Sequence, residues 1–364
     1  NYITHPYVMH SSASYYKYYY QFIDGKDHEI FCRKNVISEV DDILLDVNKI
    51  SEGHNQCDVT GITVNNNEHI MSYAVDFNGS EQYEIVFTDL ISLLPIYSKM
   101  EKVPYANYFW VNNYTVAFIR ENKSKQPYQL LFYDIYDKTT TLKHTETNGE
   151  MSISAYMSSD DKYIFISSSD YDKTKLYYIK TDNLTGEPIP MCDYVDKTLV
   201  TPEHKNGLFY FLTNVNDSTN YKICVESVDK FNGSIQDQRL WQDLIPYNEQ
   251  VTITSIEILQ NIIIFTTSVH GSDYINYYHN NTVYSFNLMG YTSIISINDW
   301  ATHQWTPLTT IYSLSLCHNV FDSQFITVSL ESMIKPVTKY QINLTITENS
   351  FIHNYNTSIN KKII

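Results

Sequence analysis

The chain has 364 residues, of which 43% are hydrophobic, so it can bury a large core without help from disulfides. Its formal net charge is −16, from 41 acidic against 25 basic residues, which argues against a nucleic-acid partner because phosphate contacts need clustered Lys and Arg. No apolar run approaches the roughly 20 residues of a membrane span, so we expect no membrane partner.

Short alternating runs of Tyr, Ile, Val, Phe and Thr fill the sequence, and this pattern predicts β-strands packed on both faces. The first two strands are expected in Tyr15–Phe22 and His28–Cys32. Hairpins with turns of Asn, Asp and Ser are then expected, in chain order, in Ile62–Tyr73, Ala106–Phe118, Ile153–Ile166, Leu199–Leu212, Ile253–Phe265 and Ile311–Val328.

A third strand is expected after each hairpin. These strands are predicted in Tyr83–Phe87, Tyr128–Phe132, Leu176–Ile179, Tyr221–Val225, Val283–Phe286 and Tyr340–Leu344. One tyrosine in each of them recurs at steps of 45, 49, 44, 63 and 56 residues, which is the period of propeller blades. A sandwich would also give many short strands, but the regular spacing favours an all-β, seven-bladed β-propeller with about four antiparallel strands per blade.

The predicted blades occupy residues 15–355, between an extended lead-in of residues 1–14 and a tail of residues 356–364. The first blade finds its strands between Tyr15 and Arg33, and the last between Ile311 and Leu344, so no terminal strand is left over as a latch. We therefore expect an unlatched ring. In the connection after the first strands, Asp46 and Asn48 stand at alternate positions and are expected to bind backbone N–H groups.

The sequence offers no catalytic machinery. No Gly-x-Ser-x-Gly elbow occurs, and the serines at Ser11–Ser12 and Ser167–Ser169 are expected at a terminus and at a blade turn. The histidines show no metal-ligand spacing, and His5 with His10 would be a poor ligand pair in an extended segment. No glycine-rich phosphate loop occurs either. We therefore predict no catalytic, cofactor-binding or metal-binding residues and no cofactor.

Acidic clusters at Asp41–Asp42, Asp160–Asp161 and Asp170 with Asp172 could bind a cation, but turn chemistry is favoured because Asp bonds to nearby backbone groups. The five cysteines are odd in number and never form a Cys-x-x-Cys pair. Buried free thiols in a reducing compartment are expected, and hence a cytoplasmic protein.

Several segments resemble the prolyl oligopeptidase family of serine peptidases, and oligopeptidase B within it. The most specific is Val40–His54, with its Leu-Leu-Asp-Val-Asn run, which is similar to the segment that follows the first blade. Further similar segments fall in the family's order: Tyr18–Tyr20, Ile30–Lys34, Ser72–Tyr83, Ser158–Ile166, Phe209–Asn214 and Ile326–Ser329 with Pro336.

The resemblance implies an unlatched ring that gates an α/β-hydrolase domain carrying Ser, Asp and His. This sequence lacks both that catalytic domain and the family's helical lead-in, so the chain alone is not expected to be an enzyme. The expected function is non-catalytic gating of peptides, with basic peptides among the expected partners, in a peptidase that cleaves after Arg or Lys, with the hydrolase domain as partner. The alternative is a non-enzymatic propeller scaffold that binds a protein partner.

Overall fold

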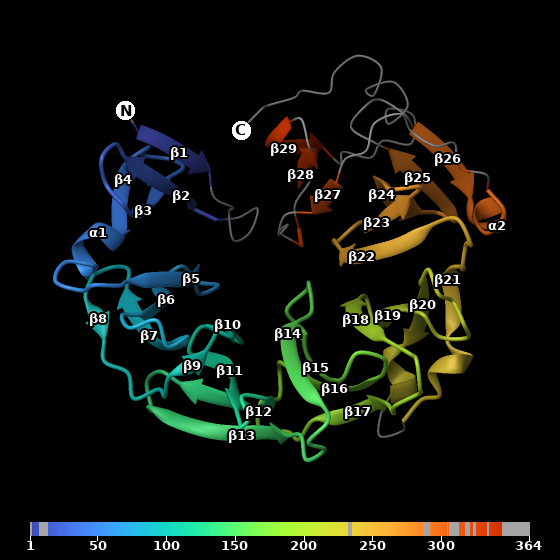
Figure 1. Cartoon of the computed structure of the whole chain (residues 1–364), viewed down its shortest axis with the longest axis horizontal. Coiled ribbons are helices and arrows are strands. Elements are labelled where there is room, and N and C mark those ends of the chain that lie inside the picture. Colours follow the sequence, from blue (N-terminus) through green and yellow to red (C-terminus); the bar gives the residue numbers. More distant parts are fainter. Residues whose placement is uncertain are drawn as a thin grey trace. The chain divides into compact units, whose positions relative to one another are not determined.

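The computed structural model describes residues 2–6, 14–231, 235–286, 292–303, 305, 313–316, 321–322, 325–332 and 335–343 (Figure 1). Within these ranges the chain is built from strands, and its helices are single turns, namely α1 (Val47–Ile50), α2 (Ile297–Trp300), η1 (Val228–Phe231) and η2 (Gln238–Leu240). No helix in the described part is long and apolar enough to cross a membrane. The all-β prediction is therefore confirmed.

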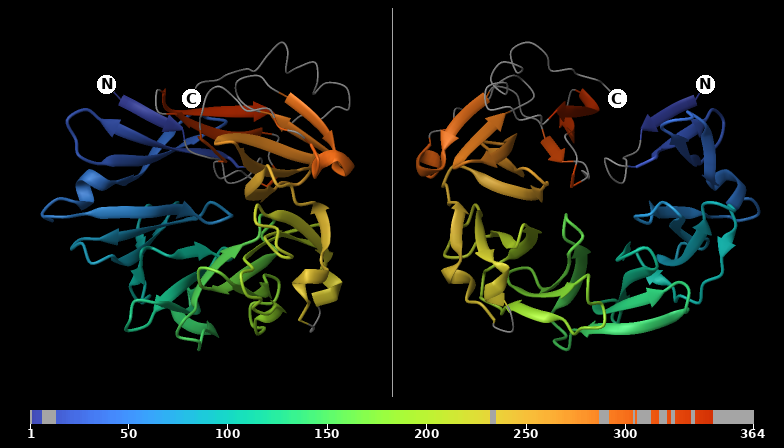
Figure 2. Two further views of the ribbon diagram at one scale, coloured as in Figure 1. Left: turned by 45° about the vertical axis from the view of Figure 1, so that its right-hand side comes forward. Right: turned by 180° about the vertical axis from the view of Figure 1, so that it is seen from behind.

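The strands form antiparallel sheets of three to five strands, each built from one continuous stretch of chain, so each sheet carries neighbouring colours in Figure 2. The first sheets along the chain are β1–β4 (Tyr2–Pro6, Tyr16–Ile23, Glu29–Asn35, Asp41–Asp46), β5–β9 (Asp58–Val64, Ile70–Asp76, Gln82–Asp89, Pro95–Ile96, Val103–Pro104) and β10–β13 (Tyr108–Trp110, Thr115–Glu121, Pro127–Asp134, Thr139–Thr145).

The later sheets repeat the same up-and-down order. They are β14–β17 (Ser152–Met157, Tyr163–Ser169, Thr174–Lys180, Ile189–Cys192), β18–β21 (Val200–Lys205, Leu208–Thr213, Lys222–Ser227, Gln242–Ile245), β22–β26 (Thr252–Ile258, Ile263–Val269, Ser272–His279, Thr282–Phe286, Thr292–Ser296) and β27–β29 (Ser313–Leu316, Phe325–Ser332, Lys335–Asn343). The number of blades in a closed ring and the absence of a latch stay predictions.

The described residues fall into two compact units. One lies within Asn1–Met157, Asp161–Tyr171 and Leu176–Ile189, and the other within Ser158–Asp160, Asp172–Lys175 and Pro190–Ile364.

Inside the first unit, each sheet packs its apolar side chains on the next one. Tyr18 and Phe31 of the first sheet share a core with Met71 of the second, and Phe87 of the second shares one with Phe118 of the third. The middle strand β6 is buried along its whole length because sheets cover both of its faces. This explains why central strands read as continuous apolar runs.

The second unit follows the same principle. Leu212 and Ile223 of the β18–β21 sheet pack with Phe265 and Trp300 of the segment that follows. Stacked rings pack outside this core as well, since Phe211 lies with its centroid 3.7 Å from that of Trp241 at an interplanar angle of 11°.

Four details differ from the expectations. Residues 2–6 are a strand paired with β2, so the first sheet begins before Tyr15. The Val40–His54 segment does not merely follow the first sheet, because it contains that sheet's fourth strand. Val283–Phe286 lies in a fourth strand, β25, because β24 precedes it. Ser167–Ser169 lie in strand β15 and not at a turn.

Candidate functional site

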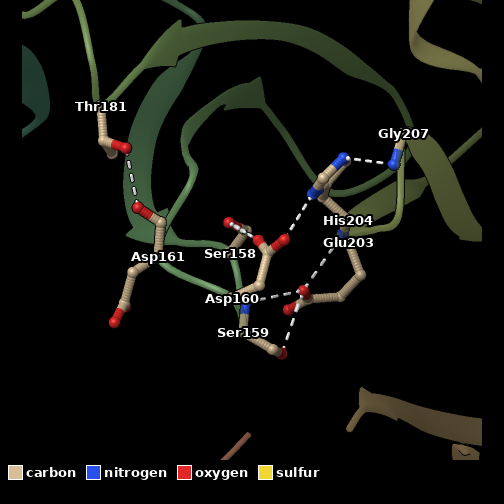
Figure 3. Close-up of polar contacts among 8 residues, drawn as sticks. All are labelled: Ser158, Ser159, Asp160, Asp161, Thr181, Glu203, His204 and Gly207. Carbon is tan, nitrogen blue, oxygen red and sulfur yellow. Dashed lines mark hydrogen bonds and ion pairs between the residues drawn. The ribbon is translucent and has the colours of Figure 1, made fainter. Parts of the chain in front are cut away.

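A group of polar side chains that hydrogen-bond to one another lies where the turn after β14 meets strand β18 (Figure 3). Ser158, Ser159 and Asp160 belong to that turn, and Glu203 and His204 to β18. These residues all belong to the second unit.

An aspartate and a histidine form the centre of the group. Oδ2 of Asp160 lies 2.8 Å from Nδ1 of His204, and their side chains are 4% and 2% exposed. The Gly207 N–H donates to Nε2 of the same ring over 3.2 Å. Because Nε2 accepts, the neutral ring with its proton on Nδ1 satisfies both contacts.

The neighbouring serine does not complete a catalytic arrangement. Ser158 Oγ donates to Asp160 Oδ1 over 2.8 Å, so the carboxylate stands between the hydroxyl and the imidazole. A serine nucleophile needs the histidine itself as the acceptor of its proton. These hydrogen bonds therefore attach the turn after β14 to strand β18, and they do not activate Ser158 as a nucleophile.

Glu203 is the titratable group of the site. Its Oε2 accepts from the Ser159 N–H and O–H, each at 3.1 Å, and from the His204 N–H at 3.3 Å. Burial raises the pKa of Glu203 to about 7, and Asp160 adds to this rise, while the three hydrogen bonds oppose it. This carboxyl therefore changes its charge near neutral pH.

Among the acidic clusters named from the sequence, Asp41–Asp42 were expected in a turn but begin strand β4, and both side chains have partners in neighbouring strands. Asp41 accepts from the Tyr19 hydroxyl over 2.6 Å, and Asp42 pairs with Arg33 over 2.9 Å. The backbone carbonyl of Asp161 accepts from Thr181, as Figure 3 shows. Asp170 and Asp172 lie in the connection from β15 to β16.

The structure describes only part of the histidine pair and of the serine-rich segments named from the sequence. Nothing is described of the His5 side chain, while His10 and Ser11–Ser12 lie outside the described residues. Ser168, in β15, donates to Glu146. Across the described residues, no three His, Cys, Asp or Glu side chains are placed to hold a metal ion.

The expectation of buried thiols holds for three of the four cysteines that the structure describes. Cys32, Cys192 and Cys224 are buried, whereas Cys57 is half-buried. Cys317 lies outside the described residues.

The turn composition of the sequence pointed to Asp160 as a candidate, whereas Glu203 and His204 were not predicted as members of a site. Their signal was present, because Val200–Lys205 places three ionisable residues next to one another in a strand that packs into the core. Buried ionisable groups need specific partners, and such a run therefore indicates a polar network.

Comparison with known proteins places this fold in a known family. Residues 5–354 match the family described as the prolyl oligopeptidase N-terminal β-propeller domain. Among curated proteins, dipeptidyl aminopeptidase BI of Pseudoxanthomonas mexicana is 22% identical over 332 residues, which cover 80% of this chain and 43% of that protein.

Solved structures show the same fold. Oligopeptidase B from Leishmania major superposes with a TM-score of 0.75 at 16% identity, covering 93% of this chain and 46% of that one. The closed, antipain-bound oligopeptidase B from Trypanosoma brucei gives 0.73 at 18% identity, covering 94% and 47%. The chain thus spans about half the length of these relatives, in which the propeller is paired with a catalytic hydrolase domain. The chain belongs to the prolyl oligopeptidase family, as its N-terminal β-propeller domain.

Proposed function

We propose that this chain gates a serine oligopeptidase of the oligopeptidase B type, limiting the peptides that reach a hydrolase domain. The match to the family's propeller domain over residues 5–354 carries the proposal. Membership of a peptidase family favours gating over a scaffold role.

The physical basis is size exclusion. A domain built from sheets stacked through large aromatic cores is stiff, and a stiff cover in front of an active site admits flexible peptides while folded proteins stay outside. The net charge of −16 supports a preference for peptides that carry Arg or Lys. The free thiols of Cys32, Cys57 and Cys224 support a reducing, cytoplasmic location.

Reconstitution tests this function. The hydrolase domain is assayed with and without this chain, on a short Arg-containing peptide and on the same sequence within a rigid, folded protein. With the chain present, the peptide should be cleaved and the folded protein spared. Equal cleavage of the folded protein in both assays would refute gating.

A further inference from the structure

Three neighbouring sheets of the first unit repeat one turn between their third and fourth strands. In each, the side chain that ends the third strand accepts two successive backbone N–H groups over 2.7 to 3.1 Å, and the residue four positions later has a φ of 56°, 57° or 55°. We call residues 35–40 the first turn, residues 89–94 the second and residues 134–139 the third. Because the three turns share these contacts, their equivalent positions can be compared directly.

The residue two positions beyond the third strand is large, apolar and exposed in every turn. Ile37, Ile91 and Tyr136 are 77%, 79% and 64% exposed. In the second turn Leu93 and Leu94 are exposed as well. Exposed apolar groups that gather on one face mark an interaction surface, whereas single ones are ordinary. Their repetition at one structural position therefore indicates a contact with a partner.

The three turns lie in order at the same end of their sheets. These sheets share apolar cores and run their strands in the same sequence, so equivalent turns lie at equivalent ends. The Arg33 guanidinium, in β3, donates to the Leu90 carbonyl of the second turn over 3.1 Å. On the other side, Nζ of Lys138 lies 4.9 Å from the centroid of the Tyr97 ring, which directly follows β8. The second turn therefore stands between the first and the third.

The position with the positive φ changes its charge along this row. It is Glu39 in the first turn, Leu93 in the second and Lys138 in the third, and both charged residues are exposed. The ion pair of Glu39 with Lys34, at 3.8 Å between exposed groups, contributes little and leaves the carboxylate available. Such a row is complementary to a copy of itself turned by 180°, because the negative end of one copy meets the positive end of the other.

We propose that this row of turns is the contact through which two copies of the chain form a symmetric dimer. A two-fold axis through the second turn places Glu39 opposite the partner's Lys138, and Lys138 opposite the partner's Glu39. It also sets Ile91 and Leu93 against their own copies. Because each copy carries a net charge of −16, opposite charges at the contact are needed to offset the overall repulsion. Asp137, exposed beside Lys138, reduces this attraction in part.

The dimer should be weak. Three turns of six residues each fall short of the roughly 20–30 residues that a standard interface uses on each side, so we expect a dissociation constant in the micromolar range. A lipid surface would also take up the apolar tips, but it gives no reason for opposite charges at equivalent positions of the first and third turns. The dimer is independent of the proposed gating, since it needs no hydrolase domain.

Sedimentation velocity of the whole chain over a range of concentrations measures the dimer. Ile91→Glu sets two carboxylates against each other at the axis and should raise the dissociation constant about tenfold or more. Tyr171→Glu is the matched control, because it puts the same charge on another exposed apolar residue of the first unit, in the connection from β15 to β16. This control should change the dissociation constant by less than about twofold. Both positions are exposed, so both variants should keep the thermal midpoint of the parent.

An exchange of charges tests the pairing itself. Glu39→Lys and Lys138→Glu each bring like charges together and should each raise the dissociation constant about threefold to tenfold. The double variant restores opposite charges and should bind within about twofold of the parent. Each new residue already occurs at this φ in the equivalent turn of the parent, so neither substitution brings a new kind of backbone strain. Asp137→Asn should tighten the dimer, because it removes a repulsion.

Several outcomes would overturn the dimer. One is a chain that stays monomeric up to about 1 mM. Another is a double variant that associates no better than Glu39→Lys or Lys138→Glu alone. Equal weakening by Tyr171→Glu and Ile91→Glu would mean that net charge alone controls association. A monomeric chain that binds phosphatidylcholine vesicles, and loses this binding in Ile91→Glu, would assign the turns to a membrane surface instead.

Discussion

Nδ1 of His204 lies 2.8 Å from Oδ2 of Asp160, and both side chains are almost fully buried. This contact ties the turn after β14 to strand β18 across 44 residues of sequence. We predict that His204→Ala lowers the free energy of unfolding by about 1–3 kcal/mol, because it leaves a buried carboxylate without this donor. Urea denaturation measures the change.

Asp160→Asn tests whether the imidazole of the Asp160–His204 pair is neutral or charged. If the imidazole is neutral, the amide oxygen can still accept from Nδ1 and the variant should lose less stability than His204→Ala. Equal losses in the two variants would instead indicate a charged pair. His54→Ala, at an exposed ring stacked on Phe77, is the control for removing a histidine.

Glu203 should make stability depend on pH. Because its pKa rises from 4.5 to about 7 on folding, the folded chain keeps this proton where the unfolded chain has lost it. The stability it contributes is complete below about pH 4.5 and is lost as the pH rises through about 7. The difference in unfolding free energy between the parent and Glu203→Gln should therefore fall from pH 5 to pH 8, by at most about 1.4 kcal/mol per pH unit. A constant difference would contradict the raised pKa.

Asp46 caps the single-turn helix α1, as the sequence suggested for the connection after the first sheet. Its Oδ1 accepts from the Asn48 N–H over 3.1 Å, and the Asn48 amide in turn holds both backbone groups of His28, at 3.0 and 2.8 Å. Asp46→Ala should lower the unfolding free energy by about 0.5–2 kcal/mol.

Asp46→Asn is the matched control for this cap. It keeps the accepting oxygen and removes only the charge. Because the cation nearest to this charge, Lys49, lies 3.9 Å away and is largely exposed, the unfolding free energy should fall by a few tenths of a kcal/mol at most. If Asp46→Ala leaves the denaturation midpoint unchanged, the cap contributes nothing to stability.

The sequence predicted most of the sheets because alternating apolar residues and turn residues are local properties. The hairpin in Ile153–Ile166 is found as β14 and β15. The regular Tyr spacing did not predict strand β24, because it pointed to Tyr284, which lies in the following strand β25. Short edge strands such as Pro95–Ile96 carry no periodicity to detect.

The candidate site depends on contacts between residues that are far apart in the sequence, and residue spacing does not predict such contacts. His204 reaches Asp160 only because β18 lies against the turn after β14. The raised pKa of Glu203 is likewise a property of the packed structure, since nothing in the sequence distinguishes this glutamate from an exposed one.

The chain should be inert toward serine-directed reagents. The sequence has no Gly-x-Ser-x-Gly elbow, and Ser158 donates to a carboxylate and not to the histidine. We therefore expect neither hydrolysis of Arg-containing peptides nor labelling by a phosphonate probe, as measured by intact mass. Stoichiometric labelling of any serine would refute this prediction.

Hydrogen exchange should reveal where the chain opens most easily. An unlatched ring joins its first and last sheets through side chains alone, which is weaker than a hydrogen-bonded seam, so local unfolding should be easiest in those two sheets. Within the first sheet, β1 pairs with β2, and in the last, β29 pairs with β28. We therefore expect amides in Tyr16–Ile23 and Phe325–Ser332 to exchange faster than those in Tyr163–Ser169, where strand β15 is buried along nearly its whole length. Mass spectrometry of peptic fragments measures the exchange rates of all three segments in one experiment. Only central strands are compared, so that the faster exchange of exposed edge strands does not decide the result. Equal protection in all three would mean that the ends are locked by backbone hydrogen bonds and that the ring is latched.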